Sequence, residues 1–169
     1  MNPETASQPK LKEILSSHPS LSQHERHDVA NQLQATLVDL VDLSLIGKQL
    51  HWNVVGSNFR SLHLELDELI DAWRLLADTV AERISALGIS ADGRASTVAA
   101  DSEITTIHDG PIKDTEVASA LTERLAVAIA KLSERTARVG EIDSASEDVL
   151  IEVARALEEN HWMIAVQSS

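Results

Sequence analysis

Apolar residues recur at every third or fourth position along four long stretches of the chain, separated by glycine-containing breaks. The first stretch extends from about residue 25 to His51, and Gly56 follows it as a candidate C-terminal cap. The second begins after Asn58, a residue type that often caps helix N-termini, and ends at Gly88. Because this spacing places apolar side chains on one face of a helix, it predicts two long amphipathic helices in the first half of the chain.

The second half of the chain repeats this pattern after a less regular segment. Residues 88–113 are interrupted by glycine, proline, serine and threonine, which predicts a loop with one short helix at residues 96–100. A third apolar stripe runs over about residues 114–139. Ser144 and Glu147 then have the spacing of a capping box, which predicts that a fourth helix begins there.

The lengths of the connections predict how these helices are arranged. Short loops join the first helix to the second and the third to the fourth, which makes each pair antiparallel. The roughly 25-residue connection between the second and third helices can run the full length of a helix. We therefore expect an all-α four-helix bundle with one long crossover, the ferritin-like topology, over residues 25–169. Residues 1–24, which contain three prolines, are interpreted as a flexible tail.

The composition of this 169-residue chain excludes several kinds of site. It contains 14 Lys and Arg residues against 27 Asp and Glu, and the formal net charge of −13 favours cations over phosphate backbones as partners. The absence of cysteine excludes disulfides, thiolate metal sites and thiol nucleophiles. No apolar run approaches the ~18 residues of a membrane span, and the first residues lack the features of a secretory signal. We expect a cytoplasmic protein without a membrane partner.

The second predicted helix carries a polar stripe in addition to its apolar face. The members of this stripe are three or four positions apart and lie within one arc of the helix: His63, Asp67, Asp71, Arg74, Asp78 and Glu82. A charged stripe on a helix is usually a solvated face, which is one interpretation. The stripe also contains imidazole and carboxylate groups in i, i+4 pairs, which suit iron, manganese or zinc, so a metal centre is the other interpretation.

The two i, i+4 pairs are too far apart to share one ion on a straight helix. Asp67 and Asp78 are separated by 11 positions, or about 16 Å of helix axis. Either the helix holds two separate sites, or each pair is half of a site that another copy of the chain completes. In the second case His63 and Asp67 of one chain face Asp78 and Glu82 of its neighbour, with His51 close to the first pair.

A di-iron centre contained within one chain is disfavoured by the spacing of its acids and histidines. The usual bundle of that kind has two Glu-x-x-His motifs, whereas this chain has one, at Glu158 and His161. We expect His161 to be a hydrogen-bonded, partly buried histidine. His24 and His27 are expected to be solvated residues at the start of the first helix, with a surface metal site as the alternative.

Several of the candidate ligands belong to a longer motif. Residues 48–56 read KQLHWNVVG and are followed by Phe59, His63 and Asp67, and then by D-x-x-x-E-R-I at residues 78–84. This motif resembles the Dps family, the DNA-binding proteins from starved cells, and the resemblance extends over about residues 25–167. It implies a hollow bacterial dodecamer of ferritin-like bundles that oxidises Fe(II), preferably with hydrogen peroxide. Storage of the Fe(III) mineral in the cavity then protects against oxidative damage.

The resemblance also implies a ferroxidase centre at a two-fold interface between subunits, with room for two iron ions. The ligands implied are His51, His63 and Asp67 from one subunit and Asp78 and Glu82 from the other. Trp52 is implied to lie beside this centre and to donate an electron, and interface packing is the alternative. Asp143 and Asp148 are implied to line an acidic pore for Fe(II), although acidic residues there also complement a helix dipole.

The N-terminal segment departs from the best-known Dps proteins, whose DNA binding is attributed to a Lys-rich tail. Here Lys10 and Lys12 are balanced by Glu4 and Glu13. Twelve copies at −13 would carry about −156, so contact with DNA phosphates is repulsive overall. We predict weak or no DNA binding and no firm association with the nucleoid. The alternatives to a ferroxidase are a nucleoid-binding structural protein and a metal-sequestering cage with another activity.

Overall fold

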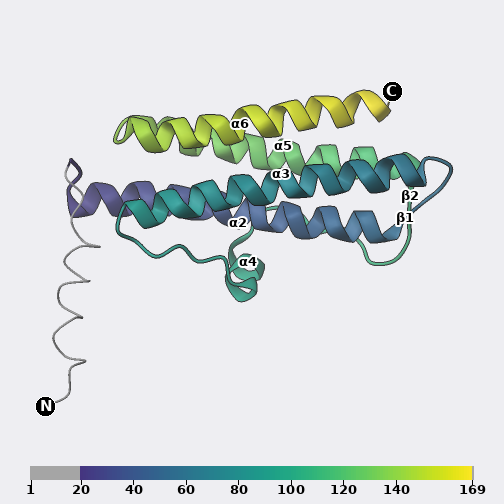
Figure 1. Ribbon diagram of the computed structural model, residues 1–169, viewed down its shortest axis with the longest axis horizontal. Coiled ribbons are helices and arrows are strands. Elements are labelled where there is room, and N and C mark those ends of the chain that lie inside the picture. Colours follow the sequence, from purple (N-terminus) through teal and green to yellow (C-terminus); the bar gives the residue numbers. More distant parts are fainter. Residues whose placement is uncertain (1–19, 169) are drawn as a thin grey trace, which may run out of the picture.

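The computed structural model describes residues 20–168 as a bundle of four long helices (Figure 1). The elements in chain order are α2 (Gln23–Asn53), β1 (Val54–Val55), α3 (Phe59–Ala86), α4 (Ala95–Asp101), β2 (Ile112–Lys113), α5 (Asp114–Gly140), α6 (Ser144–Ala165) and the 3₁₀ helix η2 (Val166–Ser168). The all-α prediction is confirmed, and the predicted short helix at residues 96–100 is α4. Most of the predicted tail, residues 1–19, lies outside the described residues.

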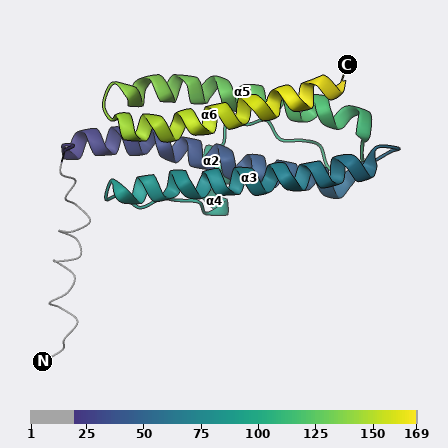
Figure 2. The ribbon, with the colours of Figure 1, turned by 45° about the horizontal axis from the view of Figure 1, so that its top comes forward.

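The four long helices form two hairpins that pack against each other. Figures 1 and 2 show α2 beside α3 and α5 beside α6, and these two pairs make the most extensive contacts in the bundle. The crossover after α3 returns along the bundle past α4, which packs on α2, and enters α5 at the end where α3 began. This is the predicted bundle with one long crossover. Within residues 20–168, no helix combines the length and the apolar character that crossing a bilayer requires.

The core is mainly aliphatic, with one large aromatic side chain at its centre. Trp73 on α3 is fully buried, and its Nε1 donates a hydrogen bond to Oδ1 of Asn160 on α6 at 3.0 Å. On the opposite side, α2 approaches closely at Gly47, where an added Cβ would lie 2.7 Å from Cγ1 of Ile70. The absence of a side chain at Gly47 therefore allows the α2–α3 contact that aligns the two helices carrying the candidate ligands.

The connection between α2 and α3 is fixed by residues that precede and begin α5. β1 pairs in parallel with β2, in the register Val54 to Ile112. The carboxylate of Asp114 accepts a hydrogen bond from the backbone N–H of Asn58 at 2.7 Å. Gly56 has φ +137° and lies so close to this carboxylate that an added Cβ would overlap it. Asn58 occupies the N-cap position of α3 as predicted, but its side chain makes no capping hydrogen bond.

The predicted capping box at the start of α6 is wrong by one residue. Asp143 is the N-cap, and its Oδ2 accepts from the backbone N–H of Ser146 at 3.2 Å and from its hydroxyl at 2.5 Å. Ser144 is instead the first residue of the helix, and the Glu147 carboxylate lies against Gly140.

A capping box does exist at the start of α2, where the side chains of Ser22 and Glu25 each accept a hydrogen bond from the other residue's backbone N–H. The sequence contains this S-x-x-E signal, but we did not predict the box.

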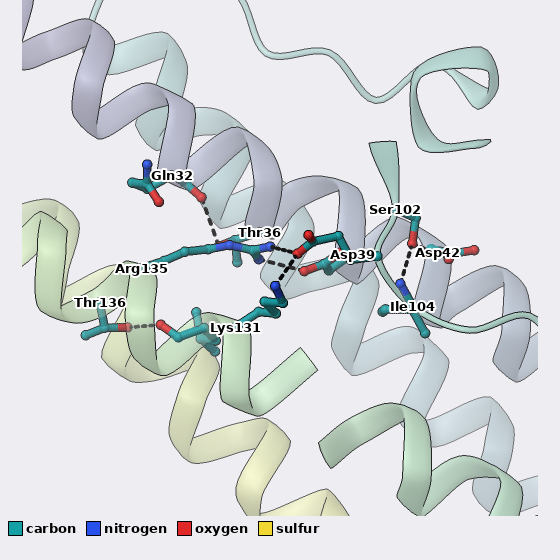
Figure 3. A network of polar contacts seen from close by, with 11 residues as sticks. Gln32, Thr36, Asp39, Asp42, Ser102, Ile104, Lys131, Arg135 and Thr136 are labelled. Atoms are coloured by element: carbon teal, nitrogen blue, oxygen red, sulfur yellow. Dashed lines mark hydrogen bonds and ion pairs between the residues drawn. The ribbon is translucent and has the colours of Figure 1, made fainter. Parts of the chain in front are cut away.

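A buried ion pair ties α2 to α5 inside the bundle (Figure 3). Nη1 of Arg135 lies 2.6 Å from Oδ2 of Asp39, and both side chains are at least 90% buried. Burial raises the pKa of Asp39 above its usual range and outweighs the opposing effect of Arg135. The crossover joins this network because Glu103 lies 3.1 Å from Lys131 and 3.7 Å from Arg135.

A second contact holds the crossover on α2. The hydroxyl of Ser102 donates to Oδ2 of Asp42 at 2.5 Å, so the segment after α4 is fastened at both α2 and α5 (Figure 3).

Candidate metal centre

Two histidines from adjacent helix ends hold each other's rings in place. His51 is in the last turn of α2 and His63 is in the first turns of α3, so the antiparallel hairpin brings them together. Nδ1 of His51 lies 2.8 Å from the carbonyl oxygen of His63, and Nδ1 of His63 lies 3.0 Å from the carbonyl oxygen of His51. The two rings are stacked, with centroids 3.6 Å apart and planes inclined by 21°.

These reciprocal hydrogen bonds determine which ring nitrogens are available to a metal. A carbonyl oxygen can only accept, so Nδ1 carries the proton in each neutral ring. Nε2 is then unprotonated in both His51 and His63, which is the form of imidazole that binds a metal ion. A backbone carbonyl holding the second nitrogen is a common arrangement around metal-binding histidines, because it fixes the tautomer and the orientation of the ring.

A carboxylate and an ammonium group lie directly beside the histidine pair. Asp67 follows His63 by one helical turn, and its Oδ1 forms an ion pair with Nζ of Lys48. The same oxygen lies 3.3 Å from Nδ1 of His51. The hydrogen bond from Lys48 outweighs the opposing effect of partial burial and lowers the pKa of Asp67, so this carboxyl is ionised at neutral pH. The structure therefore brings together His51, His63 and Asp67, and adds Lys48.

The other two predicted ligands lie farther along α3. Asp78 and Glu82 are both exposed, and the helix places Asp78 about 16 Å from Asp67 along its axis. Among residues 20–168 of one chain, no three histidine, aspartate or glutamate side chains converge on a common metal position. Asp78 instead borders a groove of about 350 Å³ between α2 and α3, whose lining includes the apolar side chains of Leu37, Val41, Leu45, Ala77 and Ala81.

The remaining sequence candidates have different surroundings. Trp52 follows His51 and is 68% exposed, so its side chain is available to a partner. Asp148 is exposed near the start of α6, whereas Asp143 is largely buried and forms an ion pair with Arg83 at 2.7 Å. Partial burial alone would raise the pKa of Asp143, but hydrogen bonds from Ser146 and Arg83 outweigh it and hold this pKa below its usual range. His161 is half-buried on α6.

Two residues in direct contact with candidate site residues were not predicted, one beside a candidate ligand and one beside a candidate pore residue. Lys48 precedes His51 by three positions and so lies on the same face of α2, a spacing that the sequence already contained. Arg83 is part of the D-x-x-x-E-R-I motif, but its partner Asp143 is 60 positions away and has no local signal.

Comparison with known proteins places the whole domain in one family. A model of the ferritin-like domain matches residues 30–168. The DNA protection during starvation protein of Mycolicibacterium smegmatis is 34% identical over 149 residues, which cover 86% of this chain and 80% of that protein. The DNA protection during starvation protein 2 of Deinococcus radiodurans is 34% identical over 132 residues, and this match covers 78% of the chain but only 55% of that relative's length.

Solved structures give the same result. The Dps of Mycobacterium smegmatis in its tetragonal form has a TM-score of 0.86 at 32% identity, with 89% of this chain and 92% of that chain covered. The Dps of Microbacterium arborescens in its high iron form has a TM-score of 0.81 at 31% identity, with coverage of 86% and 95%. The chain therefore belongs to the Dps family of ferritin-like proteins, whose general roles are iron storage and DNA protection.

Proposed function

We propose that this chain is the subunit of a dodecameric ferroxidase and iron store. Fe(II) is oxidised at sites shared between two subunits, preferably by hydrogen peroxide, and Fe(III) mineral accumulates in the cavity of the cage. One subunit contributes His51, His63 and Asp67, and the other contributes Asp78 and Glu82. The proposed setting is the bacterial cytoplasm, where removal of Fe(II) and peroxide limits oxidative damage.

The observation that carries this proposal is the reciprocal pairing of His51 and His63. A histidine that binds a metal commonly gives one ring nitrogen to a backbone carbonyl and keeps the other for the ion. Here each backbone carbonyl fixes Nδ1 and leaves Nε2 as a ligand atom, with the ionised Asp67 carboxylate in contact. A mixed imidazole and carboxylate donor set of this kind suits iron.

The separation of the two halves supports a site formed between chains. Asp78 and Glu82 are exposed on the same helix as Asp67 but lie beyond its reach, and an apolar groove borders Asp78. In a two-fold dimer, any contact of residue i with residue j is repeated as j with i. Antiparallel pairing of two α3 helices would therefore create two identical centres. Each would combine His63 and Asp67 of one chain with Asp78 and Glu82 of the other.

The proposed reaction uses one molecule of peroxide for two ferrous ions. Each Fe(II) gives up one electron, and the peroxide takes two electrons and two protons to form two molecules of water. Carboxylates are hard anionic donors that favour Fe(III) over Fe(II), so Asp67, Asp78 and Glu82 make the oxidation easier. Trp52 is proposed to lie close enough to supply an electron when only one Fe(II) is present.

Entry of Fe(II) through an acidic pore involves only one of the two candidate pore residues. Asp148 is exposed and available for this role. Asp143 is already paired with Arg83, so the two side chains together carry no net charge. We therefore assign attraction of Fe(II) to Asp148 and to the overall negative charge, and assign Asp143 mainly to holding the start of α6.

The decisive experiment compares Fe(II) oxidation by hydrogen peroxide in the parent chain and in a His63→Ala/Asp67→Ala variant. The control is His108→Ala/Asp109→Ala, which removes the same two residue types at exposed positions outside the four long helices. We expect the first variant to lose at least tenfold in initial rate and the control to retain the parent rate. Equal rates in the parent and in His63→Ala/Asp67→Ala would contradict the assignment of this centre. An equal loss of rate in this variant and in the control would indicate non-specific damage.

A further inference from the structure

The first turns of α2 contain a buried arginine that has no carboxylate partner in the part of the chain that the structure describes. Arg26 is only 7% exposed, and its Nε is buried without a hydrogen bond to any described residue. The ion pairs formed among residues 20–168 do not include Arg26. Because a guanidinium keeps its charge at any accessible pH, burying one without an anion is unfavourable.

Arg26 has one structural role, and this role uses only a small part of its hydrogen-bonding capacity. Its Nη1 donates to the carbonyl oxygen of Leu87 at 3.1 Å. Leu87 is the C-cap of α3, so Arg26 satisfies a carbonyl at the end of that helix and complements its dipole. A guanidinium has five N–H donors, and capping one carbonyl does not explain the remainder.

The side chain of Arg26 lines a pocket that is unusually poor in negative charge for this protein. The pocket has a volume of about 450 Å³, and its lining comprises Gln23, Arg26, His27, Gly88, Ile89 and Ser90. Its polar groups are thus a guanidinium, an imidazole, an amide and a hydroxyl, without a carboxylate. Four other surface pockets each contain at least one aspartate or glutamate, in a chain whose net charge is −13.

The nearest carboxylates along α2 are engaged in other contacts. The carboxylate of Glu25 accepts from the backbone N–H of the N-cap residue Ser22 at 2.8 Å. The carboxylate of Asp28 lies 3.4 Å from Nε2 of His24. The Ser22 side chain in turn accepts from the N–H of Glu25, so this cap already uses part of the helix N-terminus. Arg26 and its pocket, and not the helix N-terminus, are therefore the features that indicate a ligand.

We propose that this pocket binds an oxyanion through the guanidinium of Arg26. The planar fork of an arginine matches two oxygens of a phosphate or a carboxylate, and Ser90 and Gln23 supply further donors. The anion has two possible sources, free phosphate or a carboxylate of the chain's own N-terminal segment, which contains Glu4 and Glu13. Arg26 and His51 are 25 positions apart on α2, about 37 Å along the axis, so this site is independent of the proposed metal centre.

The test measures binding of inorganic phosphate to the full-length chain by isothermal titration calorimetry. We expect Arg26→Met to weaken binding at least tenfold relative to the parent. Arg155→Met is the control because it removes the same charge from an exposed position on α6, and we expect it to bind phosphate like the parent. Arg26→Lys retains the charge and a donor for Leu87 but lacks the fork, so we expect an intermediate affinity; circular dichroism checks that each variant is helical.

A full-length Glu4→Gln/Glu13→Gln variant distinguishes the two sources. Phosphate binding by the parent that is lost in Arg26→Met supports free phosphate as the ligand. Binding that appears only in the Glu4→Gln/Glu13→Gln variant supports a carboxylate of the chain as the resident anion. The proposal is overturned if Arg26→Met binds phosphate as tightly as the parent, or if neither the parent nor the Glu4→Gln/Glu13→Gln variant binds it. Should Arg26→Met fail to fold, unchanged affinity in Arg26→Lys overturns it equally.

Discussion

Lys48 forms an ion pair with Asp67 inside the candidate metal centre, on the same carboxylate oxygen that lies 3.3 Å from His51. One half of the proposed centre therefore contains its own cation, whereas the half formed by Asp78 and Glu82 is exposed and anionic. A metal ion that binds Asp67 must share that carboxylate with the ammonium group or displace it. This asymmetry predicts that the first ion binds tightly and the second weakly.

Replacing Lys48 with methionine should strengthen binding of the second ion. The change removes a like charge and frees Oδ1 of Asp67, for which we expect a gain of about tenfold in affinity, or ~1.4 kcal/mol. Anaerobic titration with Co(II) measures this without any oxidation step. Lys113→Met, which removes an exposed lysine, is the matched control. Identical Co(II) isotherms for the two variants would contradict the competing role of Lys48.

The buried pair of Asp39 and Arg135 predicts a large difference between single and double substitutions. Arg135→Met leaves a buried carboxylate without its partner and should cost about 3–5 kcal/mol in the free energy of unfolding. Asp39→Leu/Arg135→Met removes both charges and should recover most of this loss, since burial already disfavours the ionised form of Asp39. Urea unfolding measures the free energy of unfolding of both variants. Arg138→Met removes an exposed arginine and is the control, which should stay within about 0.5 kcal/mol of the parent. A loss below about 1 kcal/mol in Arg135→Met would contradict this account.

Asp143 should make a pH-dependent contribution to stability. Its pKa in the folded chain is lower than the ordinary value of 3.8, so its ionised form stabilises the fold above that pH and the contribution is lost as pH falls through the folded pKa. Asp143→Asn retains a capping oxygen but removes the charge facing Arg83, and should cost about 1–3 kcal/mol at pH 7. The deficit relative to the parent should shrink below pH 3.8, whereas exposed Asp148→Asn should show a small, constant effect. A deficit that does not change with pH would assign it to packing instead.

Gly56 and Gly93 form a matched pair for testing the turn that positions the two histidines. Gly56→Ala places a Cβ on the Asp114 carboxylate at φ +137°, where an L-residue is strained, so we expect a loss of at least ~2 kcal/mol. An added Cβ at Gly93 meets no atom within 4 Å, so Gly93→Ala should be neutral to within about 0.5 kcal/mol. Thermal unfolding of the two variants under identical conditions provides the comparison, and equal losses would show that the turn is not under this constraint.

The sequence predicted the parts of this fold that depend on regular spacing. The apolar stripes identify the helices because each periodic pattern extends over 20 residues or more, and the short loop between two of them brings His51 towards His63. The number of residues between Asp67 and Asp78 was also sufficient to predict that these carboxylates lie far apart, since helical rise alone sets that distance. These features need no knowledge of which side chains meet across the bundle.

Features that depend on contacts between distant segments were missed for a physical reason. Asp39 and Arg135 are 96 positions apart, and each on its own resembles an ordinary surface charge in the sequence. β1 and β2 contain two residues each, too few for any periodic pattern, and they pair only because the bundle places them together. The error at the α6 cap arose because Asp143 and Ser144 are adjacent and both are good N-cap types, so only the geometry distinguishes them.

We expect this chain to protect DNA by removing Fe(II) and hydrogen peroxide and not by binding the duplex. With a net charge of −13 per chain, the parent should leave duplex DNA unretained in a gel shift at low salt, because contact with phosphates is repulsive. The same preparation should still reduce DNA cleavage by Fe(II) and hydrogen peroxide, since removing these reagents does not require contact. His63→Ala/Asp67→Ala should lose this protection while remaining equally unable to bind DNA. Tight retention of duplex DNA by the parent, or protection that survives in the variant, would show instead that the duplex is shielded directly.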